Sequence, residues 1–145
     1  MTRQPEGCVP TPITELATAY HRYGETRSDE DFWAWERVTD IVRGPSAEKA
    51  WEMVVALVRS APDARLEYVG AGPVEDLVCI HGATLIDRIT NEARRDSRFC
   101  EALASIWLVL EDIPEAVLSE LQAVTNGQIQ VATQADIDAA NEGLI

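Results

Sequence analysis

The sequence predicts a single all-α domain, and three observations support that fold class. Apolar residues recur every three or four positions along most of the chain, which is the period of a helix buried on one side. Glycine and proline separate these stretches at positions that suit helix ends. The chain has 145 residues, 46% of them hydrophobic, and is long enough for a core without metal or disulfides. We expect stacked antiparallel helical hairpins, with an irregular helical-repeat-like superhelix as the looser alternative.

The N-terminal part of the chain predicts a flexible arm and three helices. Residues 1–11 contain two prolines and a glycine but no apolar period, so they should form the arm. Helices are predicted over 12–23, where Gly24 acts as the stop, over 30–43 and over 47–59. Only Gly44-Pro45-Ser46 separates the last two helices, and so short a turn should produce an antiparallel hairpin.

Trp33 is unusual because it falls on the polar side of the predicted helix over 30–43. At 100° per residue, it points among Glu36, Arg37 and Asp40. Trp33 either folds back on the preceding loop as a hydrophobic staple or stands exposed as a binding anchor. The residues predicted to share the buried face of this helix are Ala34, Trp35, Val38, Ile41 and Val42.

The segment from Gly70 to Gly82 holds more special residue types than any other stretch. A short helix through residue 69 should end at Gly70–Gly72, and Pro73 should start the next helix, because its missing N–H is tolerated in a first turn. That helix should end at Gly82, and another should run over 84–95.

The C-terminal part predicts a buried helix followed by weaker elements. Apolar residues cover nearly the whole circumference of the stretch 96–110, which makes it the candidate central helix. A helix from Pro114 should stop at Asn126-Gly127, and residues 128–132 could form a short extended piece. Thr133 should cap a last helix through residue 142, with Asp136 three positions on. We therefore divide the chain into the arm, one helical domain over 12–127 and a C-terminal extension over 128–145.

Glu75, Asp76 and His81 are the only group that suggests an enzyme, as a metal-dependent or acid/base hydrolase. Their spacing is unfavourable, because Asp76 lies about 140° from His81 around a regular helix. The structural interpretation explains the same residues: carboxylates are stabilised at a helix start, and imidazole suits a helix end. We favour that interpretation and expect no catalytic residue, metal ligand or cofactor, with the hydrolase as the alternative.

The charge distribution points to a basic protein partner. The formal net charge of −13 disfavours direct contact with nucleic acid or an anionic membrane. No Lys or Arg follows Arg98, so the final third of the chain carries only acidic groups. These acids form either a solvated face or a docking surface for a basic protein. The candidate partner-binding residues are Trp33, Glu75, Asp76, Glu111, Asp112 and Glu115.

Cysteine usage and the N-terminus favour a cytoplasmic protein. Cys8, Cys79 and Cys100 form an odd set without motif spacing, which indicates reduced thiols. No N-terminal stretch combines a basic region with an apolar run, and no apolar stretch approaches membrane-spanning length.

One further set of residues spans the middle of the chain: Gly72-Pro73-Val74-Glu75-Asp76-Leu77-Val78, His81-Gly82, Ala93, Phe99, Trp107 and Ala50-Trp51. In these residues the chain resembles a family of small bacterial all-helical domains of unknown function. The similarity covers roughly residues 32–110. It implies an all-helical fold and no established activity, cofactor or catalytic residue, although small helical domains of this sort can sit beside toxins as immunity proteins.

The sequence as a whole favours a non-enzymatic, acidic protein-binding module. It would act as an immunity, inhibitor or adaptor protein that engages a basic partner, such as a toxin or a nucleic-acid-binding protein. A structural subunit that buries Trp33 in a homodimer is a further hypothesis.

Overall fold

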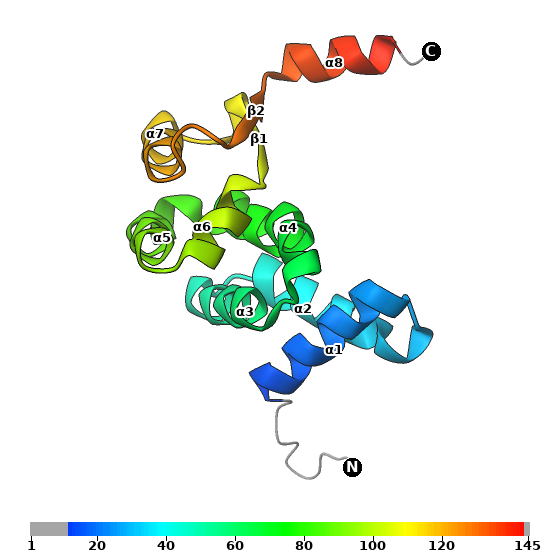
Figure 1. Cartoon of the computed structure of the whole chain (residues 1–145). Coiled ribbons are helices and arrows are strands. Elements are labelled where there is room, and N and C mark those ends of the chain that lie inside the picture. Colours follow the sequence, from blue (N-terminus) through cyan, green and yellow to red (C-terminus); the bar gives the residue numbers. More distant parts are fainter. Residues whose placement is uncertain (1–11, 144–145) are drawn as a thin grey trace.

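The computed structural model describes residues 12–143 and confirms the all-α class. The helices lie in successive layers, and the first and last helices of the described residues lie at opposite ends of the fold (Figure 1). The predicted arm over 1–11 lies outside the described residues.

The predicted hairpin is present among the three N-terminal helices. They are α1 (Ile13–Thr26), α2 (Phe32–Arg43, after the 3₁₀ turn η1, Asp29–Asp31) and α3 (Ala47–Ser60). The Ser46 hydroxyl caps α3 by accepting a hydrogen bond from the Lys49 N–H at 3.1 Å. The predicted stop at Gly24 is wrong, because α1 continues to Thr26. It ends instead at Arg27, which adopts a left-handed conformation with φ 56°.

The central helix is α5, and the prediction of three separate helices over 62–95 is wrong. Residues 63–95 form one continuous helical run: η2 (Asp63–Arg65), α4 (Leu66–Val69), the π-helical turn η3 (Gly70–Val74) and α5 (Glu75–Arg95). Gly70 has a helical φ of −61°, and a Cβ there would lie 2.2 Å from the Ala102 carbonyl oxygen. Its role is close helix packing. Gly82 lies inside α5, so neither glycine segment is a helix stop.

The predicted central helix over 96–110 is also wrong. α6 (Ser97–Ala104) ends early, and the chain continues into β1 (Trp107–Val109). β1 pairs in parallel with β2 (Gln130–Ala132), Leu108 opposite Val131. The continuous apolar pattern arose because buried helical residues such as Phe99 and Leu103 are followed by a strand with buried Leu108. A short apolar run does not by itself distinguish a buried helix from a strand.

The segment from β1 to β2 is a β-α-β unit, completed by η4 (Leu110–Asp112) and α7 (Glu115–Val124). The prediction of an extended piece near 128–132 is confirmed by β2. The predicted capping box is also confirmed: Thr133 and Asp136 bond each other's backbone N–H at the start of α8 (Gln134–Glu142). α8 buries no residue and projects from the rest of the fold (Figure 1).

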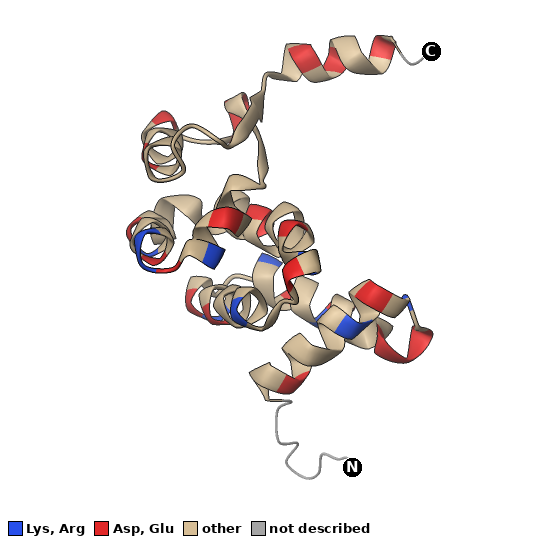
Figure 2. Cartoon of the chain, in the orientation of Figure 1, with Lys and Arg blue, Asp and Glu red and all other residues tan. Residues whose placement is uncertain are grey.

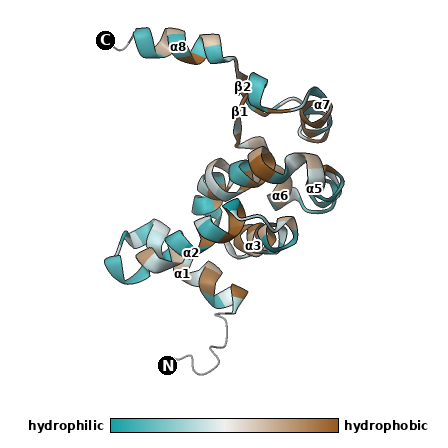
Figure 3. Ribbon diagram, turned by 180° about the vertical axis from the view of Figure 1, so that it is seen from behind, coloured by the Kyte–Doolittle hydropathy of each residue, from teal (hydrophilic) through white to brown (hydrophobic). Residues whose placement is uncertain are grey.

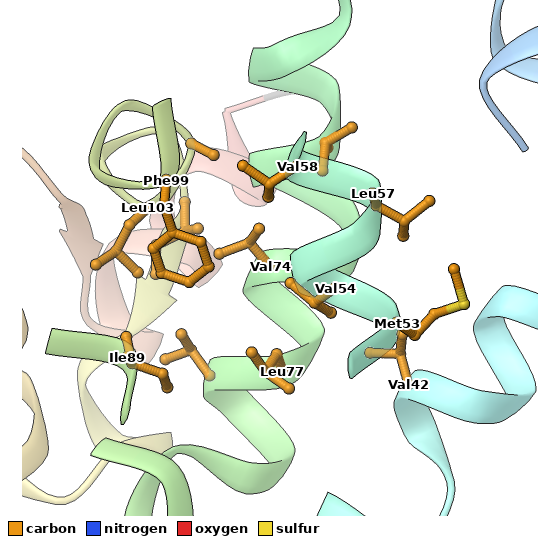
Figure 4. Close-up of a cluster of buried hydrophobic side chains, with 14 of the residues drawn as sticks. Val42, Met53, Val54, Leu57, Val58, Val74, Leu77, Ile89, Phe99 and Leu103 are labelled. Carbon is orange, nitrogen blue, oxygen red and sulfur yellow. The ribbon is translucent and has the colours of Figure 1, made fainter. Parts of the chain in front are cut away.

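The core is formed where α3, α5 and α6 meet, and α2 closes one side of it. Met53, Leu57, Leu77 and Phe99 are fully buried there (Figure 4). Hydrophobic residues are prominent on α3 and α7, whereas α8 alternates between hydrophilic and hydrophobic residues (Figure 3). The run Asp63–Arg95 is long and apolar enough to cross a membrane by composition, but half of its most apolar window is buried inside the fold.

Candidate functional site

Glu75, Asp76 and His81 each bind a different part of the protein. Glu75 Oε1 accepts a hydrogen bond from the Trp107 backbone N–H at 2.7 Å, and Asp76 forms a two-point ion pair with Arg43. His81 is buried, with Nε2 3.1 Å from the Val42 carbonyl oxygen. Across residues 12–143, no group of three or more His, Cys, Asp and Glu side chains is placed to hold a metal ion. The structure therefore does not bring these three residues to one reacting point.

The other histidine, His21, lies beside a serine but cannot act as its base. Its Nε2 lies 3.0 Å from the Leu57 carbonyl oxygen and 3.1 Å from Ser60 Oγ. A ring nitrogen that faces a carbonyl oxygen must carry the hydrogen, so Nε2 has no lone pair for the serine proton. Ser60 instead donates to the Ala56 carbonyl oxygen at 2.7 Å. Burial also lowers the pKa of His21, which keeps the imidazole neutral.

The predicted acidic residues gather around the small sheet, together with exposed apolar side chains. Trp107 is 58% exposed and Tyr68 is 62% exposed, and both line a shallow pocket beside β1. Leu110, at the start of η4, is 45% exposed. We call this region the sheet-end surface, and we define it by Tyr68, Glu75, Trp107, Leu110, Glu111, Asp112 and Glu115.

The carboxylates of the sheet-end surface are fixed by the backbone or left in solvent. Glu111 Oε1 accepts a hydrogen bond from the Gln134 N–H at 3.0 Å and so ties η4 to the start of α8. Burial raises the pKa of Glu75, although its bond from the Trp107 N–H opposes that shift. Asp112 and Glu115 are exposed, and Glu115 begins α7. The charged residues from η4 to α8 are all acidic (Figure 2).

Trp33 belongs to a different surface. It is 45% exposed and lines a shallow pocket with α1 residues that include Thr18 and Arg22. This pocket places Trp33 beside the neighbouring helix, and about half of its side chain remains in solvent. The start of α2 and η4 lie at opposite ends of the molecule (Figure 1). The six predicted partner-binding residues consequently do not form one site.

Sequence reasoning misplaced several exposed aromatic residues. Trp35 was predicted to be buried, but it is 41% exposed and stacks on Phe32, with ring centroids 5.7 Å apart. The Phe32 ring also contacts Tyr23 edge-on. Trp107 and Leu110 were assigned to a buried helix that does not exist. The sequence did contain a signal for the aromatic cluster of Tyr23, Phe32 and Trp35, since three of the four residues from Phe32 to Trp35 are aromatic.

These features define the class of protein: an acidic, helical chain that ends in a β-α-β unit with an anionic, partly apolar surface. The chain belongs to a family of unknown function, DUF6869, whose family model matches residues 21–129. That match includes α2 to α7 and the whole segment whose motif predicted such a family. Comparison with curated proteins finds no match, and comparison with solved structures finds none either.

Proposed function

We propose that this chain is a non-enzymatic module that binds a basic protein through the sheet-end surface. The observation that carries the proposal is the combination of exposed Trp107 and Leu110 with the exposed carboxylates of Glu111 and Asp112, on a stretch of the chain, residues 99–145, that contains no Lys or Arg. Exposed aromatic side chains are typical anchors of protein interfaces. Acidic groups around them would steer a cationic partner toward the surface.

The arrangement of the carboxylates adds support. Glu75 and Glu111 are held by backbone N–H groups of β1 and α8, so binding would order few additional side chains there. Asp112 and Glu115 are exposed and can pair with Lys or Arg of a partner. An immunity, inhibitor or adaptor role would use such a surface to cover the cationic face of its target.

The proposal is tested by a triple charge reversal, Glu111→Lys, Asp112→Lys and Glu115→Lys. Wild type and variant serve as bait in a lysate of the native host, and captured basic proteins are then purified for kinetic measurements. We expect the association rate at low salt to fall at least tenfold in the variant, with a flatter dependence on ionic strength.

A matched control carries the same charge change at the other end of the molecule: Glu25→Lys, Asp29→Lys and Glu30→Lys. These residues are exposed and form no ion pair within residues 12–143. Trp107→Ala should accelerate dissociation without changing the salt dependence, because it removes an apolar anchor. Equal loss of binding in the two triple variants would contradict a docking role for the sheet-end surface.

A further inference from the structure

A groove of about 660 Å³ lies between α1, α3 and the last turn of α5. None of the residues that define the sheet-end surface lines it. Its apolar wall consists of Ile13 and Ala17 from α1 and of Trp51 and Val55 from α3. Ile13 remains 36% exposed beside this space. Small-molecule sites commonly have volumes of roughly 300–1,000 Å³ with largely apolar linings, and the groove falls within that range.

One side of the groove carries a buried carboxylate between two arginines. Glu92 is only 4% exposed; its Oε2 lies 3.4 Å from Arg59 Nη2, and its Oε1 pairs with Arg95. The two arginine side chains are 60% and 70% exposed. One carboxylate between two guanidinium groups leaves a net positive charge on the triad. Each guanidinium has five N–H donors, so donors remain for a second acceptor.

The other charged residue of the lining sets a direction along the groove. Glu52 lies seven residues before Arg59 on α3, a separation of about 10 Å along the helix axis. An anionic group is therefore disfavoured near Glu52 and favoured near Arg59 and Arg95. Val55 and Ala56 lie between these two ends on α3, and both are apolar.

We propose that this groove binds an amphipathic organic anion of small-molecule size. Its carboxylate or similar group lies on Arg59 and Arg95, and its apolar body lies along Ala17 and Val55 toward Trp51. Guanidinium groups bind planar anions in two-point geometry, and burial of the apolar body adds favourable free energy. In a chain with a net charge of −13, this local excess of positive charge beside an apolar groove is what selects an anion.

The test is isothermal titration calorimetry of the full chain with decanoate, decanol and decyltrimethylammonium, which share an apolar chain and differ in the head group. We expect decanoate to bind with a Kd at least tenfold lower than the other two. Arg59→Gln should weaken decanoate binding about tenfold, because one charge-assisted contact is lost. Arg37→Gln removes the same charge from α2 outside the groove and should have no effect.

A second variant keeps the test decisive if the arginine substitution unfolds the protein. Val55→Trp fills the apolar part of the groove and leaves the three residues of the Glu92 triad unsubstituted, and it should abolish decanoate binding. Equal Kd values for the three probes, or decanoate affinity unchanged by Val55→Trp, would overturn the proposal. The proposal would also be overturned if decanoate shifted amide resonances only in residues 2–11, because decanoate would then bind outside the groove. Self-association of the wild-type chain that Val55→Trp abolishes would overturn it too, because the occupant of the groove would then be a second copy of the chain.

Discussion

At the scale of single residues, both histidines lie against carbonyl oxygens of a neighbouring helix. His21 meets the carbonyl oxygen of Leu57 on α3, and His81 meets that of Val42 at the C-terminal end of α2. Each imidazole thus supplies a hydrogen-bond donor inside a helix–helix contact. In both histidines Nε2 therefore carries a hydrogen that is bonded to a carbonyl oxygen, so Nε2 cannot act as a base.

The burial of His21 leads to a prediction about stability and pH. Its pKa is lowered from 6.5 in the folded protein, so protonation favours the unfolded chain. The stabilisation is therefore fully present above pH 6.5 and is lost as the pH falls through the lower folded-state pKa. We expect urea unfolding between pH 8 and pH 5 to show a steeper loss of stability in wild type than in His21→Gln.

The glutamine variant is a suitable control because its amide N–H can still donate to the Leu57 carbonyl oxygen, but it does not titrate. The acidic residues of the chain contribute the same background in both proteins. Superimposable pH profiles for the two proteins would show that the burial of His21 does not influence stability.

At the scale of elements, the continuous run from Asp63 to Arg95 organises the fold. A π-helical turn at Gly70–Val74 accommodates Pro73 within this run, because the wider turn tolerates the missing N–H. α6 packs directly on this turn, where Gly70 approaches the Ala102 carbonyl oxygen. The run therefore acts as one long rod against which α3 and α6 are placed.

Substitution of two glycines distinguishes a packed rod from two helix stops. Gly70→Ala should destabilise the protein by about 1–3 kcal/mol or more, because its Cβ would overlap the Ala102 backbone. Gly82→Ala should stabilise it by up to about 1 kcal/mol, because alanine favours a helix interior. A Cβ at Gly82 would meet Val117 at an ordinary distance of 3.6 Å.

Both variants are measured by urea denaturation with a shared slope. If Gly82 were a left-handed stop, its alanine variant would lose stability. A destabilised Gly82→Ala protein would therefore contradict the continuous α5 helix.

At the scale of the whole molecule, acidic residues occur throughout the fold, whereas the cations of the described residues all lie among the helical layers before β1 (Figure 2). The β-α-β unit is attached to those layers by buried Ile113, Leu121 and Ile129. α8 follows the unit but buries no residue. The boundary that matters for stability should therefore lie between β2 and α8.

Two truncations test that boundary. A chain that ends at Thr133 lacks only α8 and the residues after it, and its free energy of unfolding should stay within about 1 kcal/mol of wild type. A chain that ends at Gln128 also loses β2 and buried Ile129, and it should lose about 2–5 kcal/mol, as expected for removal of a buried aliphatic side chain. Thermal and urea unfolding measure the stability of both truncated chains. A severe loss of stability in the chain that ends at Thr133 would contradict an independent α8.

The sequence by itself determined the all-α class, the hairpin of α2 and α3, the cap of α3 and the capping box of α8. These features depend on local periodicity and on side chains that bond their own neighbours, so they are readable within a few residues. It also determined that every charged side chain in the last third of the chain is acidic.

Only the tertiary structure decided the path from Asp63 to Val109 and the grouping of the candidate residues. Gly70 and Gly82 resemble helix stops in a linear reading, but their role depends on what packs against them. Likewise, Phe99 to Leu110 is apolar throughout, and only pairing with residues 130–132 turns its end into a strand with Trp107 outside. Contacts between segments distant in sequence carry that information, and no local pattern contains it.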